Sequence, residues 1–342
     1  MSGEHPSRPL RIWAVLGAHA GDNNQVIALA KALERPFEVK QLQFNGWRRL
    51  GPRLLGRSLL SLTSASRALI LSEPPPDLTI SSGHRSVPVV RALRRGSQGR
   101  TRSIHVGFPR ISPEYFDLVI ATPQYPIPDH PNFLRVPYAL TPAALETPDV
   151  TDAAKMAALP RPRRLLIVGG PTLFWDLGET ALLQRLLSMI DDARRDRGSV
   201  LVATSPRTPA KVALSVARKL GGSGIPFALA EPLKRPSLRS VLAAADTIAV
   251  TADSVSMVSD AIWTGKPVAL IHVRKSVAGK LAFGLNDTLR PNRRLYPQDL
   301  RFFWRALSGI GISERLAKPS CSTADALQLI MSRVRIVLES IE

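Results

Sequence analysis

Short apolar runs alternate with stretches of helical periodicity along the whole chain. We predict strands at residues 11–16, 39–44, 78–81, 103–106, 118–121, 133–137, 165–168, 200–204, 227–230, 248–251 and 268–273. We predict helices at residues 23–34, 52–71, 87–95, 179–195, 209–220, 238–244, 254–263 and 323–338. This alternation is typical of parallel sheets covered by helices. It predicts an α/β protein built from doubly wound, Rossmann-like sheets.

The alternation is interrupted by a turn-rich passage, residues 141–163, that contains four prolines. A chain of 342 residues is long enough for two domains at roughly 100 to 200 residues each. We predict an N-terminal Rossmann-like domain (1–145), a linker (146–163), a C-terminal Rossmann-like domain (164–322) and a closing helix (323–342). Because open α/β sheets bind ligands at the carboxyl ends of their strands, we expect the two domains to face a central cleft.

The predicted helix at 52–71 has one basic face and one apolar face. With about 100° between successive residues, the basic face carries Arg49, Arg53, Arg57 and Arg67, and leucines lie opposite. Such a helix can lie on an anionic membrane surface, or it can simply present a solvated basic face. The pattern leaves both interpretations open.

The formal net charge of +19 is concentrated in residues 48–110, where twelve arginines and two acidic residues give +10. This field attracts anionic lipid, phosphorylated substrates or nucleic acid. Nucleic acid is the least favoured, because aromatic residues are not interleaved with the arginines. The single cysteine, Cys321, cannot form an intramolecular disulfide, and no apolar run reaches the roughly 20 residues that span a bilayer. We expect a cytoplasmic protein, peripheral at most on the inner face of the membrane.

The most informative motif is the strand, turn and helix over residues 247–268. Asp253 follows the strand and is expected to cap the helix, while Ser254 and Ser256 lie at its positive end, where anions bind. Asp260 lies about two turns further on and is a candidate ribose ligand. The alternative is an ordinary cap with a solvated carboxylate, because such caps are common.

Two other loops follow strands of the second half. Gly169 and Gly170 lack side chains, so their backbone amides can approach a diphosphate closely. The next loop offers hydroxyls and a guanidinium suited to phosphate oxygens, at Thr204, Ser205, Arg207 and Thr208. Each loop alone also fits an ordinary strand-to-helix turn.

In the first half, polar residues cluster after two predicted strands. His19, Asp22 and His84 are the candidate general bases, because each combines a usable pKa with a position at a strand end. A purely structural role remains open for each of them. The residues expected to line the acceptor site or cleft are Gly17, Gly21, Asn24, Gln25, Gly83, Arg85 and Arg110.

Several familiar signatures are absent from the sequence. It contains no Gly-x-Gly-x-x-Gly, no P-loop, no Cys/His zinc spacing and no Asp-x-Asp pair. These absences argue against dehydrogenases, P-loop proteins and zinc proteins. We expect a metal-independent mechanism with no cofactor.

These motifs together resemble the mitochondrial fission factor family of plant proteins and their bacterial relatives. The resemblance rests on Asn24-Gln25, Ser82 to Arg85, Gly169-Gly170, the run from Thr204 to Pro209 and the segment from Thr251 to Pro267. It implies a GT-B-like glycosyltransferase or nucleotide-sugar epimerase, similar in plan to the transferase that adds N-acetylglucosamine to the peptidoglycan lipid precursor. It further implies that the N-terminal domain (1–145) binds the acceptor and that the C-terminal domain (164–322) binds the nucleotide sugar. This chain has Asp22 and Asp260 where the family usually has His and Glu.

Three hypotheses follow from the residues and the resemblance. The first is inverting, metal-independent transfer of a sugar from a nucleoside diphosphate to a lipid-linked or cell-envelope acceptor. The second is epimerisation of the nucleotide sugar on the same fold. The third is a non-enzymatic, membrane-associated adaptor of the fission type. The sugar, the acceptor, the catalytic base and the oligomeric state remain open at this stage.

Overall fold

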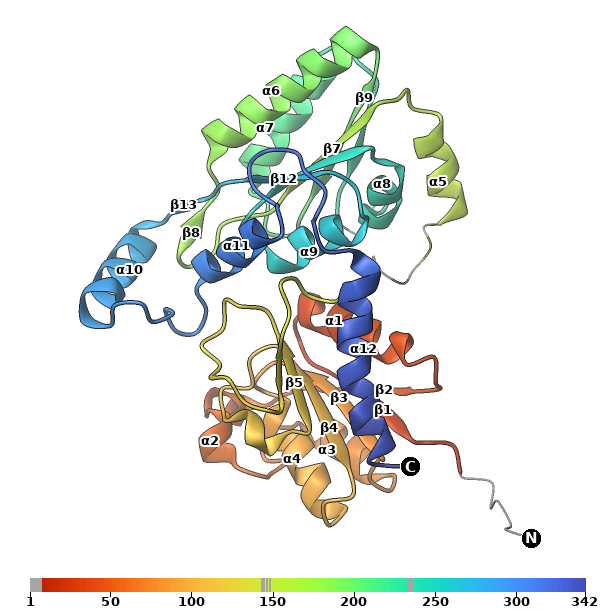
Figure 1. The fold of residues 1–342 in the computed structure, drawn as a ribbon, viewed down its shortest axis with the longest axis vertical. Helices are drawn as coiled ribbons and strands as arrows, with labels where there is room; N and C mark the ends of the chain where they lie inside the picture. The colour runs from red at the N-terminus through yellow and green to blue at the C-terminus, as the bar shows by residue number, and fades with distance from the viewer. Residues whose placement is uncertain (1–7, 143–144, 146, 148, 233–235) are drawn as a thin grey trace. The chain divides into compact units, whose positions relative to one another are not determined.

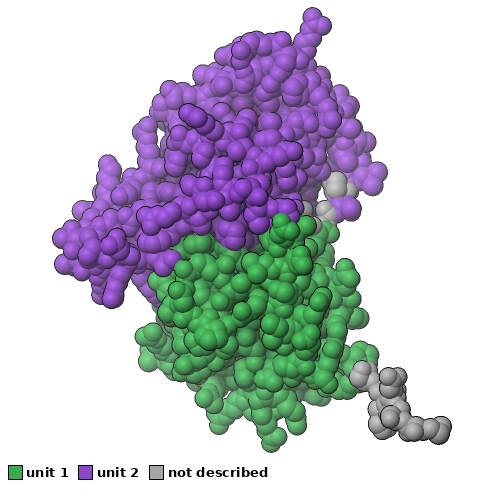
Figure 2. All heavy atoms as spheres, viewed as in Figure 1, with its two compact units in different colours: residues 1–136, 140–145, 324–342 green, residues 137–139, 146–323 purple. Residues whose placement is uncertain are grey.

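The computed structural model describes residues 8–142, 145, 147, 149–232 and 236–342. The chain divides into two compact units (Figure 2). Unit 1 comprises residues 1–136, 140–145 and 324–342, and unit 2 comprises residues 137–139 and 146–323. Residue 146, where we expected the linker to begin, lies outside the described residues. The proline-rich passage contains a helix, α5 (Val150–Ala157).

Unit 1 contains a six-stranded parallel sheet in the order β2-β1-β3-β4-β5-β6 (Figure 1). Its strands are β1 (Ile12–Leu16), β2 (Glu38–Gln41), β3 (Leu78–Ser82), β4 (Arg102–Val106), β5 (Leu118–Ala121) and β6 (Phe133–Arg135). Its helices are α1 (Ala20–Ala32), η1 (Gly46–Arg49), α2 (Pro52–Leu55), α3 (Ser64–Leu71), α4 (Val87–Gly96), η2 (Pro113–Tyr115) and α12 (Thr323–Glu339). The predicted strands of this half are present, with ends shifted by up to three residues.

The central strands of unit 1 are buried on both faces, and β3 and β4 include buried polar residues. Every residue of β1 and β3 is buried. One core cluster gathers around Trp13 and Val89, and a second gathers around Val90 and Phe116. Helix α12, at the C-terminal end of the sequence, also belongs to this unit. The carboxylate of Glu342 pairs with Arg35 at 2.7 Å, and Arg333 donates to the carbonyl of Pro131.

The single helix predicted at residues 52–71 is wrong. The helix α2 ends at Gly56, whose φ of 60° and ψ of −115° are not helical. The side-chain amide of Asn45 then donates to the carbonyls of Leu60 and Leu62 at 2.8 Å, and Leu62 forms a β-bridge with Phe44. These contacts hold the chain in a non-helical path until α3 begins at Ser64.

Unit 2 contains a five-stranded parallel sheet in the order β10-β9-β7-β11-β12, with a separate hairpin of β8 and β13. The strands are β7 (Arg163–Val168), β8 (Trp175–Asp176), β9 (Ser199–Thr204), β10 (Phe227–Ala230), β11 (Thr247–Thr251), β12 (Val268–Ile271) and β13 (Arg274–Lys275). The remaining helices are α6 (Glu179–Asp196), α7 (Ala210–Gly221), α8 (Leu238–Ala244), α9 (Val255–Trp263), α10 (Val277–Leu289) and α11 (Leu300–Gly309).

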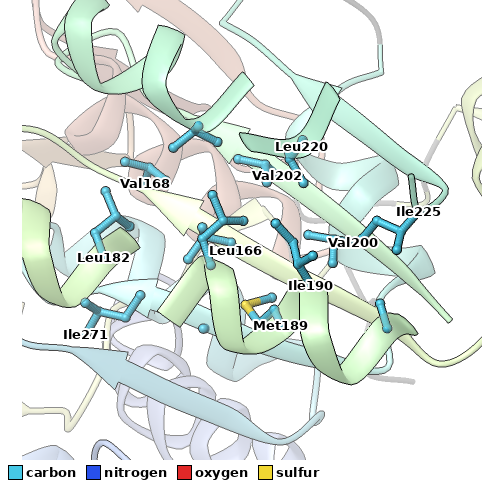
Figure 3. Packing of buried hydrophobic residues seen from close by; sticks show 14 of the residues in the cluster. Leu166, Val168, Leu182, Met189, Ile190, Val200, Val202, Leu220, Ile225 and Ile271 are labelled. Carbon is cyan, nitrogen blue, oxygen red and sulfur yellow. The ribbon is translucent and has the colours of Figure 1, made fainter. Parts of the chain in front are cut away.

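The core of unit 2 forms where helices α6 and α7 pack on the sheet (Figure 3). Leu166 and Val200 from the strands meet Leu186 and Ile190 from α6, each with an exposed fraction of 2% or less. The spacing of apolar residues correctly predicted α6 and α7. It did not predict α10 and α11, whose apolar residues partly form a separate aromatic cluster around Trp175, Phe283 and Trp304.

In each sheet, the direction in which successive strands are added reverses at one point. In unit 1 the reversal lies between β1 and β3, and in unit 2 it lies between β7 and β11. Doubly wound sheets bind ligands beside such points, at the carboxyl ends of the strands. None of the helices in the described ranges is long and apolar enough to cross a membrane.

Candidate functional site

Three loops meet at the carboxyl edge of the unit 2 sheet. They follow the neighbouring strands β7, β9 and β11 and comprise residues 169–170, 204–208 and 252–256, which we call the unit 2 loop site. The Oγ1 of Thr208 donates to the carbonyls of Val168 and Gly169 at 2.9 and 2.7 Å. The structure therefore brings together the three loops that the sequence proposed.

Gly169 and Gly170 do not present their amides to a ligand, contrary to our expectation. The amide of Gly169 donates to Oγ1 of Thr251 at 2.7 Å, and that of Gly170 donates to Oδ2 of Asp253 at 3.0 Å. Both donors are satisfied within the protein. The sequence did not reveal this, because the acceptors lie more than 80 residues further along the chain.

The two glycines are required instead by close packing. A Cβ atom at Gly169 would lie 2.2 Å from Oδ1 of Asp253, and one at Gly170 would lie 2.1 Å from the carbonyl oxygen of Arg207. The absent side chains allow the loops after β7, β9 and β11 to approach one another. The glycines therefore form the loop site without contributing donors to it.

Asp253 joins all three loops. Its Oδ2 accepts from the amide of Gly170 and from Nη2 of Arg207, both at 3.0 Å, and its side chain is 1% exposed. Arg207 also donates to the carbonyl of Gly170 at 3.1 Å, while 42% of its side chain remains exposed. The ion pair offsets the buried carboxylate charge and leaves one side of the guanidinium at the surface. Within the described residues, Oδ1 of Asp253 is buried with no hydrogen-bond partner.

Asp253 is not the N-cap of α9, so that prediction is wrong. The N-cap is Ser254, whose Oγ accepts from the amide of Met257 at a long 3.5 Å. Asp253 is unavailable because the glycine loop and Arg207 occupy its carboxylate. The amides of Val255 and Ser256 in the first turn of α9 donate to no group within the part of the chain that the structure describes. These two backbone amides are therefore the hydrogen-bond donors of the site that are available to a ligand.

The other predicted residues of unit 2 lie on or beside the same edge. Ser256 and Asp260 are half-buried on α9. Thr204 ends β9, and Oγ of Ser205 lies 3.1 Å from Oγ1 of Thr208. The indole of Trp304 donates to the carbonyl of Ala252 at 2.9 Å and supports the turn before α9. Trp304 was not predicted, because its helix was missed.

The first-half candidates also meet at one edge, at the carboxyl ends of β1 and β3. We call residues 17–25, 83–85 and 110 the unit 1 loop site. Asn23 closes its first loop: its Oδ1 accepts from the amide of Gly17 at 2.8 Å, and its Nδ2 donates to the carbonyl of Gly17 at 2.9 Å. The sequence analysis chose Asn24 and Gln25 and missed Asn23. Asn24 is exposed, and Gln25 donates to the carbonyl of Gly21 at 3.3 Å.

Asp22 and the loop of His84 are close neighbours. Gly83 has a φ of 74°, and a Cβ atom there would lie 3.5 Å from Oδ2 of Asp22. Burial raises the pKa of the Asp22 carboxyl, and the nearby His19 opposes this shift. A carboxylate with a raised pKa is a stronger base.

His84 is held in its neutral form. Burial, followed by the positive charges of Arg110, Arg85 and His19, lowers the pKa of His84 to about 4. Burial and then the charge of Asp22 raise the pKa of Tyr125 to about 12, against a hydrogen bond from Gln124 and the charge of Arg110. The unit 1 loop site is therefore a group of ionisable side chains that influence one another. Within the described residues, Nε of Arg85 is buried without a hydrogen-bond partner.

A buried histidine behind this site was missed by the sequence analysis. His105 on β4 is fully buried, and its Nδ1 lies 3.0 Å from Oγ of Ser81 on β3. Burial, with a smaller contribution from His84, lowers the pKa of His105 to about 3. No sequence signal separates it from the apolar residues of its strand.

The four arginines assigned to a membrane face do not share a helix. Arg49 lies in η1, Arg53 in α2, Arg57 in the connection after α2, and Arg67 in α3. All four are exposed. Exposed Trp47, Leu50, Leu54 and Leu60 are interleaved with the first three. The segment thus presents both charge and apolar surface without the predicted helical periodicity.

Comparison with solved structures shows the fold. A candidate UDP-N-acetylglucosamine 2-epimerase from Listeria monocytogenes aligns with a TM-score of 0.53 and 15% identity over 98% of both chains. UDP-GlcNAc 2-epimerase from Methanocaldococcus jannaschii aligns with a TM-score of 0.50 and 12% identity over 95% of this chain and all of the other. The GT-B-like expectation is confirmed.

Sequence comparison shows the family. Mitochondrial fission protein ELM1 from Arabidopsis thaliana is 29% identical over an alignment of 222 residues that covers 57% of this chain and 51% of the relative. The chain thus spans about half the length of that curated relative. The model of the family described as mitochondrial fission ELM1 matches residues 20–299, most of the chain. The resemblance inferred from the motifs is confirmed, and the chain belongs to the mitochondrial fission ELM1 family.

Proposed function

We propose that this protein is a metal-independent glycosyltransferase that uses a nucleoside-diphosphate sugar. The observation that carries the proposal is the start of α9 at the reversal point of the unit 2 sheet. There, the unsatisfied amides of Val255 and Ser256 lie beside two serine hydroxyls. Such a helix start binds phosphate oxygens through its amides and its dipole.

In this proposal the donor diphosphate binds at the start of α9. Ser254 and Ser256 donate their hydroxyls, and the exposed side of Arg207 supplies positive charge as the leaving diphosphate gains negative charge. Gly169, Gly170 and Asp253 hold the loops in place without contacting phosphate. Asp260 on the same helix binds the ribose.

The acceptor binds at the unit 1 loop site, where Asp22 is the leading candidate base. Asp22 takes the proton of the acceptor hydroxyl, and the raised pKa of its carboxyl favours this role. His84 is neutral at pH 7 and orients the acceptor. Asp22→Asn is expected to lower kcat by about 10²- to 10⁴-fold with little change in donor affinity. An equal loss of donor affinity would contradict this division of roles.

The donor site is tested by thermal unfolding with UDP-, GDP- and ADP-sugars. A ligand at about 100 times its Kd adds roughly 2.7 kcal/mol of stability. Ser254→Ala combined with Ser256→Ala should remove most of this gain. Ser237→Ala is the matched control: it removes the N-cap of α8, lowering stability without ligand but leaving the gain on binding. If no nucleotide sugar stabilises the protein, the proposal fails.

Epimerisation is the second candidate, because the aligned proteins from Listeria monocytogenes and Methanocaldococcus jannaschii bear that activity in their names. Incubation with the nucleotide sugar alone separates the two reactions. Epimerisation changes the stereochemistry of the sugar without an acceptor, as NMR would show, whereas transfer requires an acceptor. Unchanged turnover in EDTA would support the metal-independent mechanism of either reaction.

A membrane role is favoured by the segment 46–60, where exposed Trp47, Leu54 and Leu60 accompany Arg49 and Arg53. Aromatic, apolar and basic side chains together favour anionic lipid surfaces. We propose that this segment places the protein at the membrane, near a lipid-linked acceptor or as a fission-type adaptor. Arg49→Glu with Arg53→Glu should then abolish sedimentation with anionic vesicles. Retained sedimentation would remove this segment as the anchor.

A further inference from the structure

Unit 1 contains a hollow that the proposed reaction does not use. This hollow of about 450 Å³ is lined by Arg57, Arg91, Arg94, Arg95, Glu114 and Tyr115. Four guanidinium groups and one carboxylate leave three positive charges around one opening. We call this the arginine hollow.

The arginine hollow lies toward the opposite edge of the sheet from the unit 1 loop site. Arg91 lies in the middle of α4, and Arg94 and Arg95 lie in its last turn, shortly before β4 begins. Glu114 and Tyr115 lie in η2, which directly precedes β5. The loop site, in contrast, follows the carboxyl ends of the strands. A ligand in the hollow would therefore be distinct from the acceptor.

The protein neutralises only part of this charge. Arg94 pairs with Asp117 at 2.9 Å, and the guanidinium of Arg91 lies 4.3 Å from the ring centre of Tyr115. Arg57 and Arg95 have no ion-pair partner in the described ranges. Burial, and then the positive charge of Arg57, lowers the pKa of Arg91. Uncompensated like charges in a concave site favour an anion that would relieve their repulsion.

We infer that the arginine hollow binds a phosphoryl group, as a phosphomonoester or a diphosphate. Guanidinium groups match phosphate oxygens in paired hydrogen bonds, and Arg is the usual residue for such recognition. Three net positive charges favour a multiply charged anion over a single carboxylate. The volume exceeds that of one phosphate, so part of the molecule that carries the group also fits.

Two sources could supply this group. The helix α2 packs against α4, and its Leu54 is 77% exposed, so a phosphate headgroup could enter from a lipid surface. A soluble phosphorylated metabolite presents the same chemistry. Both sources require Arg57 and Arg95, the two arginines without partners.

Titration calorimetry with inorganic pyrophosphate at low ionic strength tests the site. Arg57→Gln with Arg95→Gln should weaken binding by about tenfold or more, the size expected for losing hydrogen bonds to a charged group. Arg49→Gln with Arg53→Gln removes the same charge from exposed residues outside the hollow and should weaken binding by less than about threefold. Both variants change exposed side chains, so their thermal midpoints should match that of the parent protein.

Vesicles separate the two sources. If phosphatidic acid vesicles bind the parent protein but do not bind the Arg57→Gln, Arg95→Gln variant, a lipid headgroup supplies the phosphate. If pyrophosphate binding depends on these arginines but vesicle binding does not, the source is soluble. Equal losses of pyrophosphate binding in both double variants, or no pyrophosphate binding at all, would overturn the inference. The gain in stability from nucleotide sugars should be the same in the hollow variant, so this test can fail without affecting the proposed function.

Discussion

The two loop sites differ in how their polar groups are used, although both follow the carboxyl ends of parallel strands. In unit 2, the side chains of Thr208, Arg207 and Asp253 bond to backbone and to one another. In unit 1, Asp22 and His84 lie among other ionisable groups that shift their pKa values. The unit 2 loop site is fixed by hydrogen bonds, whereas the unit 1 loop site is tuned by burial and charge.

This difference suits two tasks. A diphosphate needs donors held in place before it binds, because ordering them on binding would cost conformational entropy. Proton transfer needs a group whose pKa is displaced toward the working pH. Under the proposed function, one sheet topology would support both tasks, and the loop residues would decide which of them each unit performs.

The largest expected effect concerns the glycines. Gly170→Ala should destabilise unit 2 by about 3 kcal/mol, because its new Cβ would overlap the backbone of Arg207, and overpacking on this scale is costly. Urea unfolding followed by circular dichroism would measure the loss. Gly17→Ala in unit 1 is the control, since a Cβ atom there would have no neighbour within 4 Å and its expected cost is below about 0.5 kcal/mol. Similar losses would contradict the contrast between fixed and open loops.

Acidification should weaken unit 1 before unit 2. The pKa of His105 is lowered to about 3 and that of His84 to about 4. Between pH 6.5 and 4 the unfolded state therefore binds protons that the folded state does not, and the free energy of unfolding falls. The loss is of the order of 3 kcal/mol for buried His105, and about 1 kcal/mol for half-exposed His84 after solvent screening. Asp22, whose pKa is raised, offsets part of this loss because folding favours its protonated form.

Urea unfolding at pH 7, 5.5 and 4 would test this order. In unit 2, partners lower the pKa of the Asp196 and Asp287 carboxyls, through Arg164 and Arg301 first. Their stabilisation is present above about pH 3.8 and is lost only below it. His84→Gln should remove the contribution of His84 to the pH dependence of the free energy of unfolding of unit 1. A flat response of unit 1 from pH 6.5 to 4 would show that its histidines do not stay neutral.

A smaller effect is expected at Asp253. Asp253→Ala leaves the amide of Gly170 and the guanidinium of Arg207 without their shared acceptor, at a cost of about 2 kcal/mol. Asp253→Asn keeps a side-chain oxygen for the amide and should cost about half as much. The difference between the two variants, measured by urea unfolding, isolates the charge. Equal costs would mean that the ion pair contributes nothing measurable.

The smallest effect should come from Ser254. Its cap hydrogen bond is long, at 3.5 Å, so Ser254→Ala should cost only about 0.5 kcal/mol. Thr208→Val, which loses bonds to two carbonyls, should cost about 1.5 kcal/mol. Thermal unfolding without ligand compares the two. A larger cost for Ser254 than for Thr208 would show that Ser254 maintains the loop structure and is not reserved for a ligand.

Sequence periodicity predicted the sheets because buried parallel strands are apolar at nearly every position. The strands around Ala14 and Leu270 are of this kind. It failed over residues 52–71, where leucines at helical spacing suggested one helix. There the decisive contacts are the bonds from Asn45 to Leu60 and Leu62, which link residues outside any local window.

The sequence predicted which loops come together, but it did not predict the hydrogen-bond partners or the burial of their residues. Strand ends followed by Gly, Ser, His or Asp indicated which loops lie together at the carboxyl edge of each sheet. The use of the groups depends on partners distant in the sequence, such as Asp253 for Gly170. Burial is equally invisible in the sequence, so neither the pKa shift of His84 nor the presence of Tyr125 beside Asp22 could be foreseen.

The return of α12 to unit 1 has a consequence for biosynthesis. Residues 324–342 complete the unit whose sheet is translated first, and residues 146–323 form the whole of unit 2 apart from three residues. On the ribosome, unit 2 can therefore finish folding while unit 1 still lacks the helix that pairs Glu342 with Arg35. The first unit to begin folding is the last to be completed, so a nascent chain arrested before residue 324 would expose an unfinished first unit to chaperones and proteases.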